Sequence, residues 1–182
     1  MNKNKETILS ILKEFKMVFI TIIVMIVTFQ FILLNGIIPS ESMEPTVMTN
    51  DSVIAFRLAY LFSEPKRGDI ILFNSSQTNH TEYIKRVIGV SGDIVELKEG
   101  YVYVNNEKID EDEYVNGKTF VGKNNISRFE VPDGHVFVLG DNRENSADSR
   151  FMSDPYINCD DITGKLVLRY SILRNGFFIE PM

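Results

Sequence analysis

The stretch that decides the fold class is Asp93–Ile109, DIVELKEGYVYVNNEKI. It holds two short runs of β-branched and aromatic residues, which are enriched in strands. The runs are separated by Lys98-Glu99-Gly100, and Asn105-Asn106 follows the second run. Glycine and asparagine are typical turn residues. The stretch therefore predicts a β-hairpin followed by a second turn.

Other short segments on both sides of this hairpin have the same character. They are rich in Val, Ile, Tyr and Phe and are separated by Gly, Pro, Asn and Asp; they are Ser52–Phe56, Asp69–Asn74, Tyr83–Val90, Ser127–Val131, His135–Leu139 and Lys165–Leu173. No amphipathic helices intervene, so the sequence predicts a mainly β domain, an antiparallel barrel or sandwich, rather than a βαβ sheet. Residues 106–126 are acidic, rich in asparagine and weakly patterned, and we expect a small excursion from the main sheet there.

Composition excludes several classes of protein. Of 182 residues, 44% are hydrophobic and 24% charged, which argues against a disordered chain and a multi-pass membrane protein. The single cysteine, Cys159, excludes an internal disulfide and a multi-cysteine zinc site, and we expect it to be a small apolar filler. With only His80 and His135 besides, we expect no metal and no cofactor. The net charge of −6 argues against a nucleic-acid partner.

An apolar run near the N-terminus predicts a membrane span. Met17–Leu34, MVFITIIVMIVTFQFILL, has only Thr21, Thr28 and Gln30 as polar interruptions. About twenty helical residues reach across the roughly 30 Å of a bilayer core. A buried core helix would show a polar face, and a secretory signal peptide would be followed by a small-x-small cleavage pattern. We therefore expect an uncleaved anchor over residues 17–35.

The distribution of charge predicts the orientation of this anchor. Residues 1–34 hold four lysines and two glutamates, a net +2, whereas the remaining residues carry a net −8. Positive charge beside a span stays in the cytoplasm. We expect residues 1–16 to be a short cytoplasmic segment and residues 36–182 an extracytoplasmic domain of the plasma membrane.

Three polar motifs carry the chemistry. Ser40 and Ser42 lie in Pro39–Thr46, PSESMEPT, where the chain leaves the predicted span; alone, this motif also fits a solvated linker. Lys85 lies in the strand segment YIKRV between Tyr83 and Val87, where it is either a desolvated amine or a surface lysine. The third motif, 140–150 (GDNRENSADSR), is a hydrated loop or a network of Asp–Arg pairs beside a site.

Together with Arg67-Gly68-Asp69, these motifs resemble the bacterial type I signal peptidases, also called leader peptidases. Four motif regions stand in the family's order: PSESMEPT, RGD, YIKRVIGVSGD and GDNRENSADSR. With the preceding span they cover most of residues 17–150. The resemblance implies a membrane-anchored serine endopeptidase that removes signal peptides from secretory preproteins with small residues at positions −1 and −3. It implies no cofactor and no obligate protein partner.

The resemblance also implies roles for individual residues. Ser42 matches the nucleophile and Lys85 the general base, while Ser40 and the N–H of Ser42 match the oxyanion hole. Ser146 matches a serine that orients the lysine amine. The supporting ion-pair region is matched by Asp141, Arg143, Asp148 and Arg150, and the pockets for the substrate side chains by Ile38, Met43, Tyr83 and Ile84. Glu41 departs from the glycine common between the two serines, and we expect it to face solvent.

Physical chemistry supports a dyad of Ser42 and Lys85 independently. A serine hydroxyl needs a base to remove its proton during attack. A lysine of ordinary pKa, about 10.4, is protonated at neutral pH, but burial lowers the pKa by up to roughly 3–5 units. Neither histidine stands in a recognisable triad motif.

Two rival functions and one local alternative stay open. A non-catalytic or dedicated relative of the signal peptidases would serve as an assembly factor for surface structures such as pili, but it has no need for both Ser42 and Lys85. A self-cleaving repressor would carry a DNA-binding helix-turn-helix where this chain has an apolar run. The segment Phe56–Phe62 is either a core strand with its turn or a contact with membrane lipid.

Overall fold

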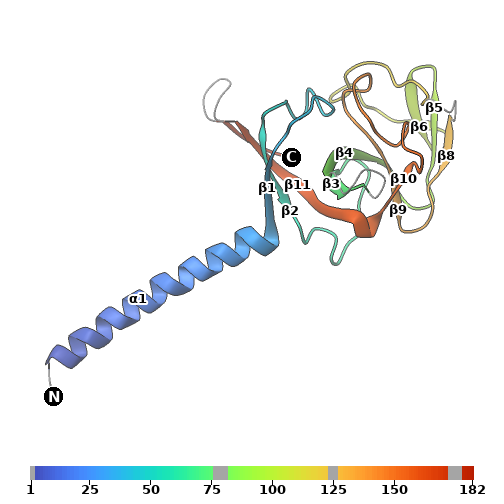
Figure 1. Ribbon diagram of the computed structural model, residues 1–182. Coiled ribbons are helices and arrows are strands. Elements are labelled where there is room, and N and C mark those ends of the chain that lie inside the picture. The colour runs from blue at the N-terminus through green and yellow to red at the C-terminus, as the bar shows by residue number, and fades with distance from the viewer. Residues whose placement is uncertain (1–2, 76–81, 123–126, 172–177) are drawn as a thin grey trace.

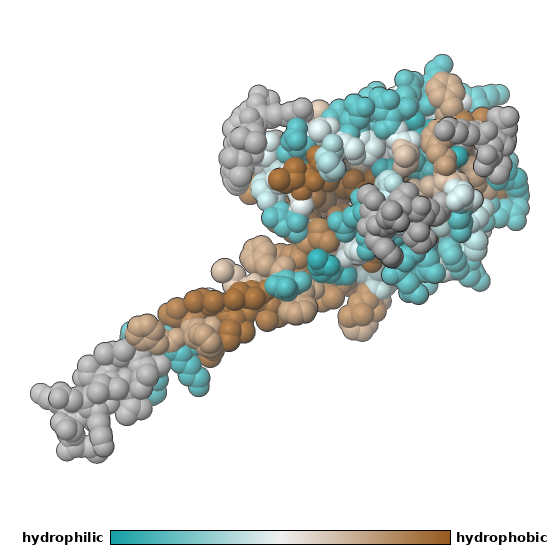
Figure 2. Space-filling view, in the orientation of Figure 1, coloured by the Kyte–Doolittle hydropathy of each residue, from teal (hydrophilic) through white to brown (hydrophobic). Residues whose placement is uncertain are grey.

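A long helix leads into a β-rich body (Figure 1). The structure, a computed structural model, describes residues 3–75, 82–122, 127–171 and 178–182. Helix α1 spans Lys3–Val27 and continues as a π-helical turn, Thr28–Ile32. From Lys13 to Val27 every residue is exposed, and Figure 2 shows an apolar surface over most of this part of the helix, with hydrophilic patches near its beginning. The 20 residues Lys13–Ile32 are long and apolar enough to cross a membrane.

The apolar run does not end as helix. Leu33–Ile37 form strand β1, which pairs with β2 (Ser52–Phe56) from Leu33 opposite Phe56 to Ile37 opposite Ser52. The Arg57 N–H also donates to the Ile32 carbonyl at 2.9 Å. The helix thus ends at Ile32, before residue 35, where the anchor was predicted to end, because strand pairing recruits Leu33 and Leu34.

The main sheet is antiparallel and curls into a half-barrel (Figure 1). Its strand order is β1-β2-β11-β3-β4-β9-β10, and β12 pairs with β11. The bounds of the strands not yet given are Ile70–Asn74 for β3, Glu82–Gly89 for β4, His135–Leu139 for β9, Tyr156–Asn158 for β10, Ile162–Ser171 for β11 and Phe178–Pro181 for β12.

The predicted hairpin lies in a second, four-stranded sheet of order β7-β6-β5-β8. Strands β5 (Ile94–Lys98) and β6 (Tyr101–Val104) are joined by Glu99 and Gly100, and both have positive φ. Asn105 and Asn106, also at positive φ, lead into β7. Asparagine and glycine tolerate this backbone region, which accounts for Gly100, Asn105 and Asn106, whereas Glu99 adopts it without such a preference. The remaining strands are β7 (Glu107–Lys108) and β8 (Arg128–Glu130).

The mainly β prediction is confirmed, and the differences lie in short or polar strands. Each predicted strand is present within a few residues of its expected bounds. Strands β1, β7, β10 and β12 were not predicted; β7 and β10 are only two and three residues long. His80, residues 123–126 of the excursion and residues 172–173 of the last predicted strand lie outside the described residues.

Among the described residues, the core of the body consists of three apolar clusters, and each of them includes a residue of strand β4: Ile84, Ile88 and Val87. The first cluster includes Ile38, Met43 and Ile84. The third includes Val87, with Tyr83 packed against it. Successive side chains of a strand point to opposite faces, so β4 presents Ile84 to the first cluster and Val87 to the third. This placement buries the centre of β4.

Candidate active site

Residues 38–51, which we call the Ser42 loop, connect β1 to β2 and carry the predicted nucleophile. The loop is closed at its base, since the Ile38 N–H donates to the Asp51 carbonyl at 2.9 Å and the Asn50 N–H donates to the Ile38 carbonyl at 2.8 Å. Within it, the Val47 N–H donates to the Met43 carbonyl at 2.9 Å and so forms a single turn beside Ser42. Met43 and Val47 are fully buried and fix this turn on the core.

Lys85 of β4 meets Ser42 although 43 positions separate them in sequence. Its Nζ lies 2.8 Å from Ser42 Oγ and donates to the Ile84 carbonyl, also at 2.8 Å. Ser42 is 5% exposed and Lys85 only 3%. The lysine is therefore a desolvated amine and not the surface lysine of the alternative interpretation.

Burial changes the acidity of this amine. Removal from water disfavours the ammonium and lowers the Lys85 pKa to about 8, although the nearby carboxylates of Asp148 and Asp141 oppose the shift. The fully buried Val87 follows two residues later on the same strand, and the Tyr83 ring centroid lies 5.7 Å from Nζ. A substantial fraction of Lys85 is thus neutral near pH 8 and able to accept a proton.

The loop 140–150 holds the main chain around Ser42. The Asn142 N–H donates to the Ser42 carbonyl at 3.1 Å, and the Asn142 side-chain amide donates to the Glu41 carbonyl at 3.2 Å. Gly140 packs so closely that a Cβ there would overlap both Ser42 O and Ser146 Oγ. Only glycine allows this approach of the two loops.

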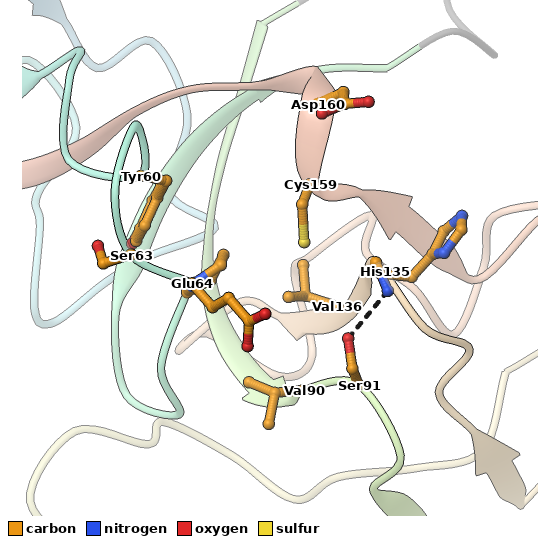
Figure 3. Close-up of a pocket in the computed structure, with 11 residues that line it drawn as sticks. Tyr60, Ser63, Glu64, Val90, Ser91, His135, Val136, Cys159 and Asp160 are labelled. Atoms are coloured by element: carbon orange, nitrogen blue, oxygen red, sulfur yellow. Dashed lines mark hydrogen bonds between the residues drawn. The ribbon is translucent and has the colours of Figure 1, made fainter.

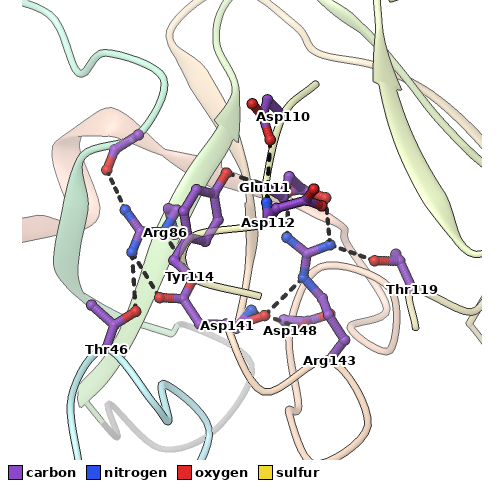
Figure 4. A network of polar contacts seen from close by, with 12 residues as sticks. Thr46, Arg86, Asp110, Glu111, Asp112, Tyr114, Thr119, Asp141, Arg143 and Asp148 are labelled. Carbon is purple, nitrogen blue, oxygen red and sulfur yellow. Dashed lines mark hydrogen bonds and ion pairs between the residues drawn. The ribbon is translucent and has the colours of Figure 1, made fainter. Parts of the chain in front are cut away.

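A buried ion pair joins this loop to β4 and to the Ser42 loop (Figure 4). The Arg86 guanidinium binds Asp141 at two points, with Nε–Oδ1 at 2.8 Å and Nη2–Oδ2 at 2.7 Å. The Asp141 side chain is completely buried. Arg86 Nη2 also lies 3.4 Å from Thr46 Oγ1 of the Ser42 loop. The residue after Lys85 therefore couples three segments of the site, through a bidentate, charge-assisted contact.

Two further buried pairs stiffen the loop itself. Asp148 binds Arg150 at 2.8 Å through both carboxylate oxygens, and its Oδ2 also accepts from the Gly140 N–H. Arg143, fully buried, forms a bidentate pair with Glu111 and donates to the Gly140 carbonyl at 3.0 Å. Of the two alternatives for residues 140–150, the structure therefore has the network of ion pairs and not the hydrated loop.

The RGD motif, Arg67-Gly68-Asp69, contacts strand β4 and the segment that follows it. Arg67 pairs with Asp93 at 2.9 Å, and the Gly68 carbonyl accepts from Arg86 at 3.0 Å. The carboxylate of Asp69 accepts from Lys165 at 2.6 Å and from the Tyr60 hydroxyl at 2.8 Å. Burial works against ionisation of Asp69, but these contacts outweigh it and lower its pKa.

Not every predicted site residue makes the contact expected of it. Ser146 Oγ is buried and has no hydrogen-bond partner among the described residues, so it does not make the expected contact with the Lys85 amine. Ser40 is exposed, and its Oγ lies 3.4 Å from Ser42 Oγ, within reach of a group that reacts there. Glu41 is exposed, as expected.

The four residues predicted to line substrate pockets separate into two groups. Ile38, Met43 and Ile84 share one apolar cluster. Tyr83 lies against another, with its ring stacked on Phe73 at 5.8 Å. Met43 is completely buried and attaches the Ser42 loop to the first apolar cluster.

Sequence reasoning missed partners that come from distant segments: Arg86, Glu111, Thr119, Asn142 and Arg169. Glu111 and Thr119 belong to the supposed excursion 106–126, yet both contact Arg143. For Arg86 the sequence does offer a signal, because this arginine directly follows the predicted base, Lys85. No comparable signal marks Glu111, because it is one of several acidic residues in a weakly patterned stretch.

A cavity of about 230 Å³ lies apart from the dyad, beside β9 and the segment that follows β10 (Figure 3). Its lining includes Tyr60, Glu64, His135 and Cys159 and contains neither Ser42 nor Lys85. Burial raises the pKa of the Cys159 thiol, and the residue packs against the third apolar cluster. Cys159 thus packs against apolar side chains, as expected from the sequence, but it is only partly buried and borders the cavity.

The segment Phe56–Phe62 is the end of a strand followed by a turn, and part of it is exposed. Phe56 ends strand β2, and Tyr60 packs against the core. Leu58, Leu61 and Phe62 are 40%, 61% and 95% exposed.

Comparison with known proteins identifies the family. A family model described as signal peptidase, peptidase S26, matches residues 11–171. A probable signal peptidase I-2 of Synechocystis sp. is 36% identical over 138 residues, which are 73% of this chain and 61% of that protein. Signal peptidase I of Bacillus caldolyticus is 32% identical over 162 residues, 84% of this chain and 87% of that protein.

A solved structure is also similar. The crystal structure of a signal peptidase I from Enterococcus faecalis V583 is 31% identical, with a TM-score of 0.44, and the match covers 57% of this chain and 97% of that chain. The family predicted from the four motifs is confirmed by the family model and the curated relatives. The chain belongs to the signal peptidase family, peptidase S26.

Proposed function

We propose that this chain is a membrane-anchored serine endopeptidase that removes N-terminal signal peptides from secretory preproteins, with Ser42 as nucleophile and Lys85 as general base. The observation that carries the proposal is the 2.8 Å contact between Lys85 Nζ and Ser42 Oγ in a buried setting. A hydroxyl paired with an amine of lowered pKa has the geometry and acidity of an activated nucleophile.

The proposed reaction begins when Ser42 Oγ attacks the carbonyl carbon of the scissile peptide bond while neutral Lys85 takes the hydroxyl proton. The resulting oxyanion accepts hydrogen bonds from the Ser42 N–H and the Ser40 hydroxyl. Lys85 then gives its proton to the leaving amine as the C–N bond breaks, which leaves an ester on Ser42. A water molecule, deprotonated by Lys85, attacks that ester. The bond between the acyl carbon and Ser42 Oγ then breaks, Lys85 returns the proton to Oγ, and the signal peptide leaves with a new carboxyl group.

The placement of the dyad relative to the helix supports membrane-surface cleavage. The long apolar helix ends at Ile32, and Ser42 follows after one short strand. We propose that the lysines before the span stay in the cytoplasm and that the β-rich body lies outside the plasma membrane. A signal peptide held in the same bilayer would then present its cleavage site near Ser42. The exposed Leu61 and Phe62 belong to the proposed lipid contact.

The proposed substrates have small side chains at positions −1 and −3. Tyr83 and Ile84 directly precede Lys85 on β4, and Ile38 and Met43 belong to the Ser42 loop. We assign all four to the walls of these subsites. Ile38, Met43 and Ile84 pack together in one apolar cluster, and Met43 adjoins Ser42, which supports apolar subsites at this place.

A non-catalytic or dedicated assembly factor for surface structures is the second candidate. Such a protein has no need for a buried lysine beside a serine, because burying an ammonium costs free energy. The paired burial of Ser42 and Lys85 therefore favours the peptidase.

Cleavage of a preprotein tests the proposal directly. We expect the full chain, solubilised in detergent, to cut a secretory preprotein once, after a residue with a small side chain. N-terminal sequencing of the product locates the cut, and the S42A variant serves as the inactive control. Failure to cut any of several preproteins would favour the assembly factor.

The pH dependence should report on Lys85. The base must be neutral to act, and its pKa is lowered to about 8. We therefore expect kcat/KM to rise with pH through a midpoint near 8, far below the value of about 10.4 for a free lysine. Measurements from pH 6 to 10 on one preprotein give the midpoint, and a profile that is flat over this range would remove Lys85 as the base.

Ser40 should act on the transition state. We expect Ser40→Ala to lower kcat by about 10²–10³-fold with KM nearly unchanged, because a donor aimed at the developing oxyanion is most valuable in the transition state. Ser40→Thr keeps the hydroxyl and should recover part of the loss. Equal wild-type rates in both variants would exclude Ser40 from the oxyanion hole.

A further inference from the structure

Arg169 of strand β11 contacts the Ser42 loop, although it belongs neither to the proposed dyad nor to the 140–150 loop. In the antiparallel pairing Arg169 stands opposite Val53 of β2 and opposite Glu180 of β12. Its side chain is 17% exposed, so it is largely enclosed between these strands and the loop. None of the four family motifs includes it.

The guanidinium contacts the Ser42 loop at two places. Arg169 Nη1 donates to the Thr46 carbonyl at 2.5 Å and lies 3.5 Å from the Pro45 carbonyl. The same nitrogen lies 3.7 Å from Asp51 Oδ2 at the base of the loop. Asp51 is buried, and its Oδ2 also accepts from the Met48 N–H at 2.9 Å. One cation thus spans the middle and the end of the loop.

Glu180 holds the guanidinium in this position. Arg169 Nε donates to Glu180 Oε2 at 2.7 Å, and Nη2 contacts the same oxygen. The Glu180 side chain is 54% exposed, so water screens this pair and its contribution is modest. The geometric effect is larger: with Nε and Nη2 bound to Glu180, the planar fork directs Nη1 toward the loop.

Thr46 connects two arginine side chains to the turn that adjoins Ser42. Thr46 is contacted on its carbonyl by Arg169 and on its hydroxyl by Arg86. It lies inside the turn closed by the Val47 N–H and the Met43 carbonyl, and Met43 adjoins Ser42. A displacement of about 1 Å at reacting atoms can lower a rate by roughly 10²-fold.

We propose that Arg169 is a positioning residue for Ser42, which holds the Ser42 loop so that Oγ stays within reach of both Lys85 and the substrate carbonyl. Strand β12, through Glu180, is then part of the support of the active site. This inference rests on the proposed peptidase function, and it adds a group that touches neither the substrate nor the dyad.

The test compares Arg169→Met with Arg128→Met in the detergent-solubilised full chain. Arg128 is a matched control because it also pairs with carboxylates, Glu96 and Glu130, but it lies on β8 of the second sheet. For Arg169→Met we expect kcat to fall about 10- to 100-fold, KM to stay within about twofold and the pH midpoint to stay near 8. Amide hydrogen exchange, read by mass spectrometry, should speed up in residues 38–51. Arg128→Met should change none of these.

Two results would overturn the inference: a kcat within about twofold of wild type, or a lower kcat with unchanged exchange in residues 38–51. If Arg169→Met fails to fold, Arg169→Lys decides, because an ammonium keeps the charge but cannot bind the loop and Glu180 as a fork. We expect an intermediate kcat for it, and full activity would contradict the proposal. An inactive wild-type enzyme would refute the proposed function instead, while hydrogen exchange would still report whether Arg169 holds the loop.

Discussion

Ser42→Ala, Lys85→Ala and the double variant are expected to lose activity to the same extent, at least about 10³-fold in kcat/KM. The hydroxyl and the amine lie 2.8 Å apart. In the proposed mechanism they act in one proton transfer, so removing either one should remove the whole function. Groups that act as a unit are not additive, and the second substitution should cost almost nothing more. Initial rates on a single preprotein measure all three variants.

Two additional lysine variants sharpen this comparison. Lys85→Arg should also be inactive, because a guanidinium stays protonated at any usable pH. Lys98→Ala is the control, since Lys98 is an exposed lysine on β5 of the second sheet, and it should retain wild-type activity. Near-normal turnover in Lys85→Ala would mean that another group is the base.

Arg150→Met is expected to be the most destabilising change in the 140–150 loop. Asp148 and Arg150 have side chains that are 0% and 1% exposed, and Arg150 Nη2 also donates to the Arg143 carbonyl at 2.7 Å. Removing the guanidinium leaves the Asp148 carboxylate buried without its charge partner, at a cost of roughly 3–5 kcal/mol. For a domain of this size, that corresponds to a Tm lower by roughly 6–20 °C.

The matched control is the exposed pair of Arg128 and Glu130, whose side chains are 48% and 72% exposed. Arg128→Met should cost no more than about 1 kcal/mol, because surface ion pairs contribute little. Thermal unfolding of both variants in the same detergent provides the comparison. Equal Tm values for Arg150→Met and wild type would show that the loop does not depend on this pair.

The local part of the fold was predictable because it depends on residue type. Runs of β-branched and aromatic residues predicted the central strands, and Gly100, Asn105 and Asn106 predicted turns that require positive φ. The same holds for the long apolar helix, whose composition alone distinguishes it from the body. In the candidate site, motif residues such as Ser42 and Lys85 were identified by their local sequence.

The sequence by itself therefore determined the mainly β class, the apolar helix, the family, and the two residues, Ser42 and Lys85, that we propose as the dyad. Only the tertiary structure decided that Leu33 leaves the helix for strand β1, that Glu111 neutralises Arg143, and that Arg169 reaches the Ser42 loop. Turn and strand preferences act between neighbours in the chain, whereas these three outcomes depend on which backbone or charge a distant segment presents. A lone charged residue in a sequence carries no mark of its partner, because the pairing is selected only when folding excludes water from both.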